Sequence, residues 1–270
     1  MIYLQNFVND SNNFWEWEEP LKTIARFFSI LMIILLLITC AGGKKAEKKD
    51  GAISVEEHFR LGFDAAGRGN LEEAASKYKE VLRLDPKNSR AHLNLGIVYG
   101  RQGKWGEEIS EYKKAIRIDP ELAEAYFNLG VSYNERGDLN EAAAQYQKAL
   151  QINQNYVEAH NNLGIIYFRK GKMNEALSEF QKAVEIKPDY TRGYYNLGNV
   201  YRQMKKLDEA IDSFKQTLEI HPKYGEAHYH LALIYYEKQK FESAIQHLDE
   251  AARLGIVVDP TFLGRLKIYR

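Results

Sequence analysis

The chain has 270 residues, with 37 basic and 37 acidic side chains, so its formal net charge at neutral pH is zero. Nucleic-acid-binding domains usually carry a basic excess, and this balance argues against that class of function. The single cysteine excludes an intrachain disulfide, and the 45% hydrophobic content is ordinary for a folded soluble domain.

The first 40 residues predict a signal or a membrane anchor. Residues 27–39 are apolar apart from Ser29 and Thr39, and the basic residues Lys22 and Arg26 precede this run. A positive flank, a short apolar stretch and small residues after it are typical of a secretory signal.

Cys40 comes directly after the apolar run, and the segment LLLITCAGG resembles the lipobox of bacterial lipoproteins. Leu37 and Cys40 fit that motif, whereas Thr39 departs from the glycine or alanine that is usual before the cysteine. The resemblance implies that Cys40 is acylated and holds the chain at the outer membrane, with the remainder in the bacterial periplasm.

Two other interpretations of this segment stay open. One is an uncleaved inner-membrane anchor, because four lysines between residues 44 and 49 favour a cytoplasmic location for the repeats after them. The apolar run is, however, shorter than the ~20 residues that span a bilayer. The other is an ordinary cleaved signal. Acidic residues such as Glu18 and Glu19 are unusual ahead of a signal, so the true start of translation could also lie near Leu21. We expect a signal or anchor over 1–40 and a flexible, charged tether over 41–54.

Six consecutive copies of a 34-residue pattern run without insertion from Val55 to Val258. Their predicted bounds are 55–88, 89–122, 123–156, 157–190, 191–224 and 225–258. We call the position of a residue in its copy, from 1 to 34, its step. Step 7 is always leucine. Step 8 is always small: Gly62, Gly96, Gly130, Gly164, Gly198 and Ala232.

Each copy is expected to form two helices joined by a turn, because apolar and small residues recur three and four apart in both halves. Step 15 is glycine in four copies, which predicts a left-handed turn, and this turn should cost more at Lys205 and Gln239. Step 20 is alanine in every copy but the second, and we expect the exception, Glu108, to point into solvent. A single pair cannot bury its apolar face alone, so the pairs should stack.

These residues resemble the tetratricopeptide repeat (TPR) family in leucine, glycine, tyrosine, alanine and proline at the family's spacing, over about three quarters of the chain. Histidine or tyrosine stands at step 4, where the family often has tryptophan, and Gln154 replaces a proline. The resemblance implies an all-α fold, a right-handed superhelical solenoid of six helix-turn-helix repeats. Phe262, Leu266 and Tyr269 predict a short capping helix within residues 259–270.

No catalytic constellation or phosphate-binding loop is recognisable, so the sequence predicts neither an enzyme nor a bound cofactor. Four of the seven histidines share step 4: His58, His92, His160 and His228. They should lie about one helix pair apart, too far to share an ion, and we expect no metal site. His228 and His230 are two apart and should point to different faces of their helix.

The first helices of such repeats line a concave face in the family, and step 6 places a row of asparagines there: Asn94, Asn128, Asn162 and Asn196. An amide offers both donors and an acceptor, so it can bond the backbone of an extended peptide without reading its sequence. The row is similar to the asparagine ladder in the repeat domain of O-linked N-acetylglucosamine transferases. Aromatic residues at step 5 could grip apolar side chains of the ligand: Phe59, Phe127, Tyr195 and Tyr229. The alternative is that amides and rings serve the protein's own packing.

The sequence therefore predicts a membrane-tethered adaptor that binds an extended peptide or protein partner in its groove and assists assembly of an envelope complex. Its layout, repeats behind a lipobox, resembles the pilotin lipoproteins of type IV pili, whose partners are pilus and secretin proteins. The alternative is a substrate-recruiting partner of an envelope enzyme, such as a peptidoglycan hydrolase or a glycosyltransferase. A purely structural spacer is a third possibility.

Overall fold

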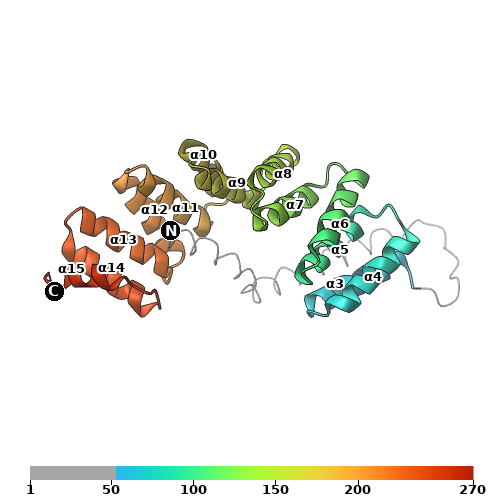
Figure 1. Cartoon of the computed structure of the whole chain (residues 1–270), viewed down its shortest axis with the longest axis horizontal. Coiled ribbons are helices and arrows are strands. Elements are labelled where there is room, and N and C mark those ends of the chain that lie inside the picture. Colours follow the sequence, from blue (N-terminus) through green and yellow to red (C-terminus); the bar gives the residue numbers. More distant parts are fainter. Residues whose placement is uncertain (1–52, 270) are drawn as a thin grey trace, which may run out of the picture. The chain divides into compact units, whose positions relative to one another are not determined.

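The computed structural model describes residues 53–269, which form thirteen helices and no strand (Figure 1). The predicted signal, Cys40 and nearly all of the predicted tether lie outside these residues. Among the described helices, none is both long and apolar enough to cross a membrane.

Twelve of the helices form six pairs, each made of a leading and a trailing helix. The leading helices are α3 (Val55–Gly67), α5 (Ser89–Arg101), α7 (Ala123–Glu135), α9 (Val157–Arg169), α11 (Thr191–Gln203) and α13 (Gly225–Glu237). The trailing helices are α4 (Leu71–Leu84), α6 (Trp105–Ile118), α8 (Leu139–Ile152), α10 (Met173–Ile186), α12 (Leu207–Ile220) and α14 (Phe241–Arg253). Each trailing helix packs against its own leading helix and, in the first five pairs, against the next leading helix, so the pairs stack in chain order as in Figure 1. The predicted all-α solenoid is confirmed.

The turn inside each pair is left-handed, as step 15 predicts. Glycine has a φ between 72° and 83° at this step in the first four pairs. Lys205 and Gln239 take its place with φ of 61° and 58°. A side chain with a Cβ pays roughly 1–2 kcal/mol for this conformation, so these two turns are less favourable than the glycine turns.

The core of each pair forms where the step-8 residue of the leading helix meets a side chain at step 24 of the trailing helix. A Cβ on Gly164 would lie 2.7 Å from the ring of Phe180, which is fully buried. Tyrosine or phenylalanine stands at step 24 wherever step 8 is glycine. In the sixth copy, Ala232 at step 8 goes with Leu248 at step 24, and both are fully buried. Glycine is therefore required by the ring that covers it.

Glu108 does not point into solvent, and this expectation is wrong. Its side chain is buried, and Ser132 Oγ donates a 2.6 Å hydrogen bond to it from the next leading helix. Space for the carboxylate comes from Gly100, where a Cβ would lie 2.8 Å from Glu108 Oε1. Burial raises the pKa of Glu108, although the hydrogen bonds from Ser132 and Tyr112 oppose this shift.

A short helix, α15 (Pro260–Lys267), covers the last pair and confirms the predicted cap. Asp259 caps its N-terminus by accepting a hydrogen bond from the backbone of Thr261 at 2.8 Å. Phe262 and Leu266 are buried, and the Phe262 ring meets that of Tyr236 edge-on at 5.3 Å between centroids. The exposed flank that a terminal repeat would otherwise leave to water is thus covered.

Candidate functional site

The leading helices are joined to one another by hydrogen bonds between residues 35 positions apart. The pairs are Arg101 Nη1 to Ala66 O (2.8 Å), Arg169 Nη1 to Asn134 Oδ1 (2.9 Å), Asn196 Nδ2 to Asn161 Oδ1 (2.8 Å), and Tyr195 Oη with His230 Nε2 (3.2 Å). Because one copy has 34 residues, this spacing links neighbouring leading helices with the same register at four of the five junctions, α5 to α7 being the exception. Steps 5, 6, 12 and 13 therefore lie along one face of the stacked leading helices, which we call the leading face.

A groove of about 270 Å³ opens on the leading face between the first three copies. It is lined by Phe59, Phe63, Arg90, Leu93, Asn94, Leu122 and Glu124. The structure thus brings two predicted site residues, Phe59 and Asn94, into one groove. Phe63 is 66% exposed there, although it is a large apolar side chain. It lies four residues after Phe59, on the same side of α3, and this helical spacing could have identified it from the sequence.

Two of the predicted asparagines bond a tyrosine at step 24 of the preceding copy. Asn94 bonds the hydroxyl of Tyr78, and Asn162 Nδ2 lies 3.4 Å from the hydroxyl of Tyr146. Burial raises the pKa of Tyr78 to about 12, and the bond from Asn94 opposes this. These amides therefore satisfy phenol groups of the protein's own core.

The other two asparagines have different partners, and for Asn196 the reason is visible in the sequence. Phe180 stands where a tyrosine would precede Asn196, so no hydroxyl is available, and the buried Asn196 donates to Asn161 instead. Asn128 donates to the backbone carbonyl of Glu124 on its own helix at 2.7 Å. An amide has two N–H donors and an acceptor, so each asparagine keeps bonding capacity beyond these contacts. The binding role of the row stays a prediction.

The four aromatic residues at step 5 are partly buried and contact other rings. These contacts, by distance between centroids, are Phe59–Tyr78 (5.5 Å), Phe127–Tyr156 (4.8 Å), Tyr195–Tyr224 (5.0 Å) and Tyr229–Phe262 (6.4 Å). Each ring therefore has a packing role, and the part that remains exposed is what a ligand could reach.

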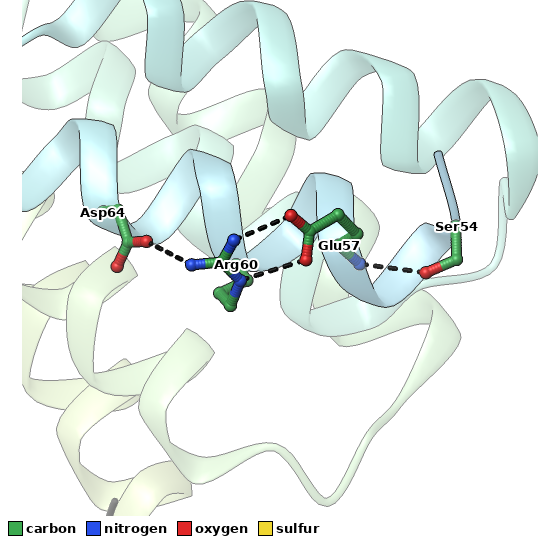
Figure 2. A network of polar contacts seen from close by, with 4 residues as sticks. All are labelled: Ser54, Glu57, Arg60 and Asp64. Carbon is green, nitrogen blue, oxygen red and sulfur yellow. Dashed lines mark hydrogen bonds and ion pairs between the residues drawn. The ribbon is translucent and has the colours of Figure 1, made fainter. Parts of the chain in front are cut away.

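The first copy has Arg60 at the step of the asparagines, and its charge is neutralised locally. Figure 2 shows Arg60 between two carboxylates of its own helix, bonded to Glu57 at 2.7 and 3.0 Å and to Asp64 at 3.0 Å. Ser54 caps the same helix by accepting a hydrogen bond from the backbone of Glu57. At this step, the first copy therefore has an ion-paired arginine on the surface, and the asparagines start with Asn94 in the second copy.

Three of the four step-4 histidines, His92, His160 and His228, have side-chain partners that sequence reasoning missed. His92 Nδ1 lies 2.5 Å from Glu111, and His160 Nδ1 lies 2.6 Å from Glu179, in each case across the pair. Burial alone would raise the pKa of Glu111, but the contacts with His92 and Lys114 outweigh it and lower the pKa. Within the described residues, no group of three potential ligands is placed to hold a metal ion. As expected, His228 and His230 face different ways, toward α14 and α11 respectively.

Comparison with known proteins identifies the class of protein that this geometry defines. One family model, described as TPR repeat, matches residues 67–103, 101–135 and 132–171. A second, described as tetratricopeptide repeat, matches residues 155–223 and 189–256. Together they span well over half of the chain, which therefore belongs to the tetratricopeptide repeat family. A scaffold of such repeats is suited to protein–protein interaction, and neither model indicates a catalytic family. No curated protein matches the chain in sequence.

Several solved structures share the fold. A crystal structure of MamA is 31% identical, with a TM-score of 0.56, over 62% of this chain and 97% of that one. YrrB, described as a TPR protein with an unusual peptide-binding site, is 23% identical, with a TM-score of 0.61, over 72% of this chain and 100% of that one. PilF of Pseudomonas aeruginosa is 18% identical, with a TM-score of 0.69, over 80% of this chain and 97% of that one. At such identities, YrrB and PilF show the shared fold alone.

Proposed function

We propose that the chain is a membrane-tethered adaptor whose leading face binds an extended segment of a partner protein. In this proposal, the adaptor assists assembly of an envelope complex of the pilus or secretin kind. The observation that carries the binding role is the groove lined by Phe59, Phe63, Leu93 and Leu122. Of these residues Phe63 is exposed at 66%, whereas Leu93 and Leu122 form the buried floor of the groove, and an exposed large apolar side chain in a groove commonly marks an interaction site.

The polar residues of the groove support an extended peptide as the ligand. Asn94 is half-buried at the groove, and Arg90 and Glu124 lie on either side of it in sequence. An amide that keeps a free donor can bond a peptide backbone, while the apolar residues beside it take a side chain. The groove would then bond the peptide backbone at few points, so it would not fix the direction of the peptide strongly. It would select for one apolar or aromatic side chain of the peptide.

The tether part of the proposal rests on the sequence before residue 53. The apolar run over residues 27–39, with Cys40 directly after it, supports either a lipid anchor or an uncleaved membrane anchor. More than one acyl chain is needed for lasting attachment, because each buried methylene contributes only about 0.8 kcal/mol. The peptide-binding site described for YrrB, which shares the fold, is consistent with a peptide-binding adaptor.

The binding role can be tested with two matched substitutions. Phe63 and Trp105 are both large exposed apolar residues, at 66% and 44%, but only Phe63 lines the groove. We expect Phe63→Asp to abolish cross-linking of partner proteins from membrane extracts and Trp105→Asp to leave it unchanged. Recovery of pilus or secretin proteins supports the proposal, whereas an envelope hydrolase or glycosyltransferase would favour the recruiting role. Equal capture by both variants would show that the groove does not bind the partner.

The asparagine row is best tested at Asn128, because its amide bonds only the backbone of its own helix and no core phenol. Asn128→Ala should weaken partner capture while leaving the circular dichroism spectrum and the unfolding midpoint nearly unchanged. Unchanged capture would assign the row to packing alone.

The tether is tested by metabolic labelling with a fatty acid. Label that is lost in Cys40→Ser supports the lipid anchor, whereas an unlabelled chain that stays in the membrane fraction supports the uncleaved segment. A chain released into the soluble fraction in both forms would refute membrane tethering.

A further inference from the structure

Two histidines of the sixth pair face each other through the same ring nitrogen. His228 of α13 and His247 of α14 have their Nδ1 atoms 2.9 Å apart, and their ring centroids lie 5.2 Å apart at an interplanar angle of 39°. Both side chains are half-buried, on two helices that lie side by side in Figure 1, so a small ion can reach them from solvent. Imidazole is the commonest metal ligand among side chains, and this pair is therefore a candidate metal site.

Other copies show what usually stands at the same two steps. Steps 4 and 23 hold a histidine and a glutamate in the second and fourth copies, namely His92 with Glu111 at 2.5 Å and His160 with Glu179 at 2.6 Å. An ionised carboxylate only accepts hydrogen bonds, so those two histidines donate from Nδ1. In the sixth copy, His247 stands at step 23 in place of the glutamate, and its ring can present a lone pair to a metal ion.

The second ring nitrogen of His228 fixes the tautomer of its neutral form. Nε2 lies 3.1 Å from the backbone carbonyl oxygen of Pro222, which can only accept a hydrogen bond. Nε2 therefore carries the proton, and Nδ1 keeps its lone pair directed at His247. Metal-bound histidines typically donate their second N–H to a carbonyl or a carboxylate in this way, which holds the ring in place. His228 is thus oriented as a ligand by the fold itself.

His247 is held by packing and is neutral at pH 7. Its ring stacks on that of Tyr235, with 5.5 Å between centroids and 14° between planes. Burial first, then His228 and Lys215, lower the pKa of His247 to about 4. Without a metal ion, Nδ1 of His247 donates its proton to the lone pair of His228. The two neutral tautomers of imidazole differ only in which nitrogen carries the proton, so moving it to Nε2 frees the second lone pair.

The charges around the two histidines are mixed. Lys215 of α12 acts on His247, and Glu250, one turn after His247 on α14, lies near enough to His228 for its pKa to be lowered by it. Glu250 accepts a hydrogen bond from Nε of Arg253 at 2.7 Å. Within the part of the chain that the structure describes, no third histidine, cysteine or carboxylate completes a group of three ligands. A metal ion would therefore have two protein ligands and take water at its remaining positions.

We propose that His228 and His247 bind a divalent transition-metal ion through their Nδ1 atoms, with Cu²⁺ bound most tightly. Two nitrogens at about 2.0 Å from a metal are about 2.8 Å apart at the right angle of a tetragonal Cu²⁺ site and about 3.3 Å apart in a tetrahedral Zn²⁺ site. The observed 2.9 Å is closer to the first, and Cu²⁺ also heads the general order of affinity. We expected no metal site because the step-4 histidines are far from one another, but the second ligand here stands at step 23.

Titration of the full, tag-free chain with Cu²⁺, followed by calorimetry and electron paramagnetic resonance, tests the site. We expect one tightly bound ion per chain, with nitrogen couplings from two imidazoles. His228→Gln and His247→Gln should each weaken binding by more than tenfold, because losing even an outer partner of a metal ligand typically costs about 10–100-fold. His221→Gln, the control, removes an exposed histidine outside the pair and should leave binding unchanged. Binding that survives both substitutions in the pair, or that Zn²⁺ exceeds, would overturn the assignment.

His247→Glu separates metal binding from folding. It recreates in the sixth copy the histidine–glutamate pair that the second and fourth copies already contain, so the pair should still fold. The circular dichroism spectrum should stay the same, while the two-imidazole signal of Cu²⁺ should disappear. A two-imidazole signal that persists in this variant would show that the ion is bound elsewhere, and this result would overturn the site.

Discussion

The requirement for glycine at step 8 can be tested by copying into the fourth pair what the sixth pair already has. In the fourth pair, Gly164 lies under the ring of Phe180, and an added Cβ would approach Cε1 to 2.7 Å and Cδ1 to 2.9 Å. In the sixth pair, Ala232 and Leu248 occupy the same two steps without conflict. The change Gly164→Ala therefore creates a clash, and the further change Phe180→Leu should relieve it.

The expected magnitudes come from the geometry. Alanine favours a helix over glycine by about 1 kcal/mol, but an extra methyl group in a packed core costs about 1–3 kcal/mol. Because the ring of Phe180 is only 1% exposed and cannot swing aside, we expect Gly164→Ala to destabilise by about 1–2 kcal/mol. Phe180→Leu alone should cost about 1 kcal/mol, on the order of one buried methylene. The double variant should lose less than the sum, with a coupling energy of about 1 kcal/mol or more.

Urea unfolding monitored by far-UV circular dichroism measures the four corners of this cycle. Gly106→Ala is the control for helix propensity, because nothing lies within 4 Å of its added Cβ, and it should stabilise by up to about 1 kcal/mol. Additive losses in the double variant, or a Gly164→Ala chain as stable as wild type, would refute the inference that the ring dictates glycine.

Three further outcomes are expected from urea unfolding. Lys205→Gly should raise stability by about 1 kcal/mol, because φ is 61° there, whereas no gain would mean that the turn is unstrained. Burial raises the pKa of Glu108, so the stability it contributes below its ordinary pKa of 4.5 is lost as pH rises through the folded value. Glu108→Gln should therefore gain stability relative to wild type as pH rises, and parallel profiles would contradict this. Burial, His228 and Lys215 lower the pKa of His247 to about 4, so stability should fall as pH drops from 6.5 to 4. His247→Gln should flatten this fall, and an unchanged slope would assign it to other groups.

The helix pairs and their turns could be predicted because the information is local and repeated. Step 15 is the left-handed turn in every copy, and step 7 is a leucine of the leading helix in every copy. The left-handed turns at Lys205 and Gln239 were predictable for this reason, although neither residue favours such a turn. The register of one copy, once known, fixes that of the others.

The burial of Glu108 could not be predicted, because it depends on residues brought together only by folding. The carboxylate is buried because Gly100 leaves space and Ser132 of the next copy supplies a hydroxyl. Glycine and serine at these steps look unremarkable in the sequence. The pairing of His92 with Glu111 is similar, since the two residues are nineteen apart and meet across the pair.

The hydrogen-bond partners of the asparagine row limit how many of its amides could bond the backbone of a ligand. Had all four amides been free, the face would be a uniform clamp for peptide backbone along its length. Instead, the tyrosines at step 24 engage two of them, and Asn196 is bonded to Asn161. On the proposed function, backbone bonding along a ligand would therefore be reduced, and selectivity would depend on the apolar groove, where Phe63 is exposed.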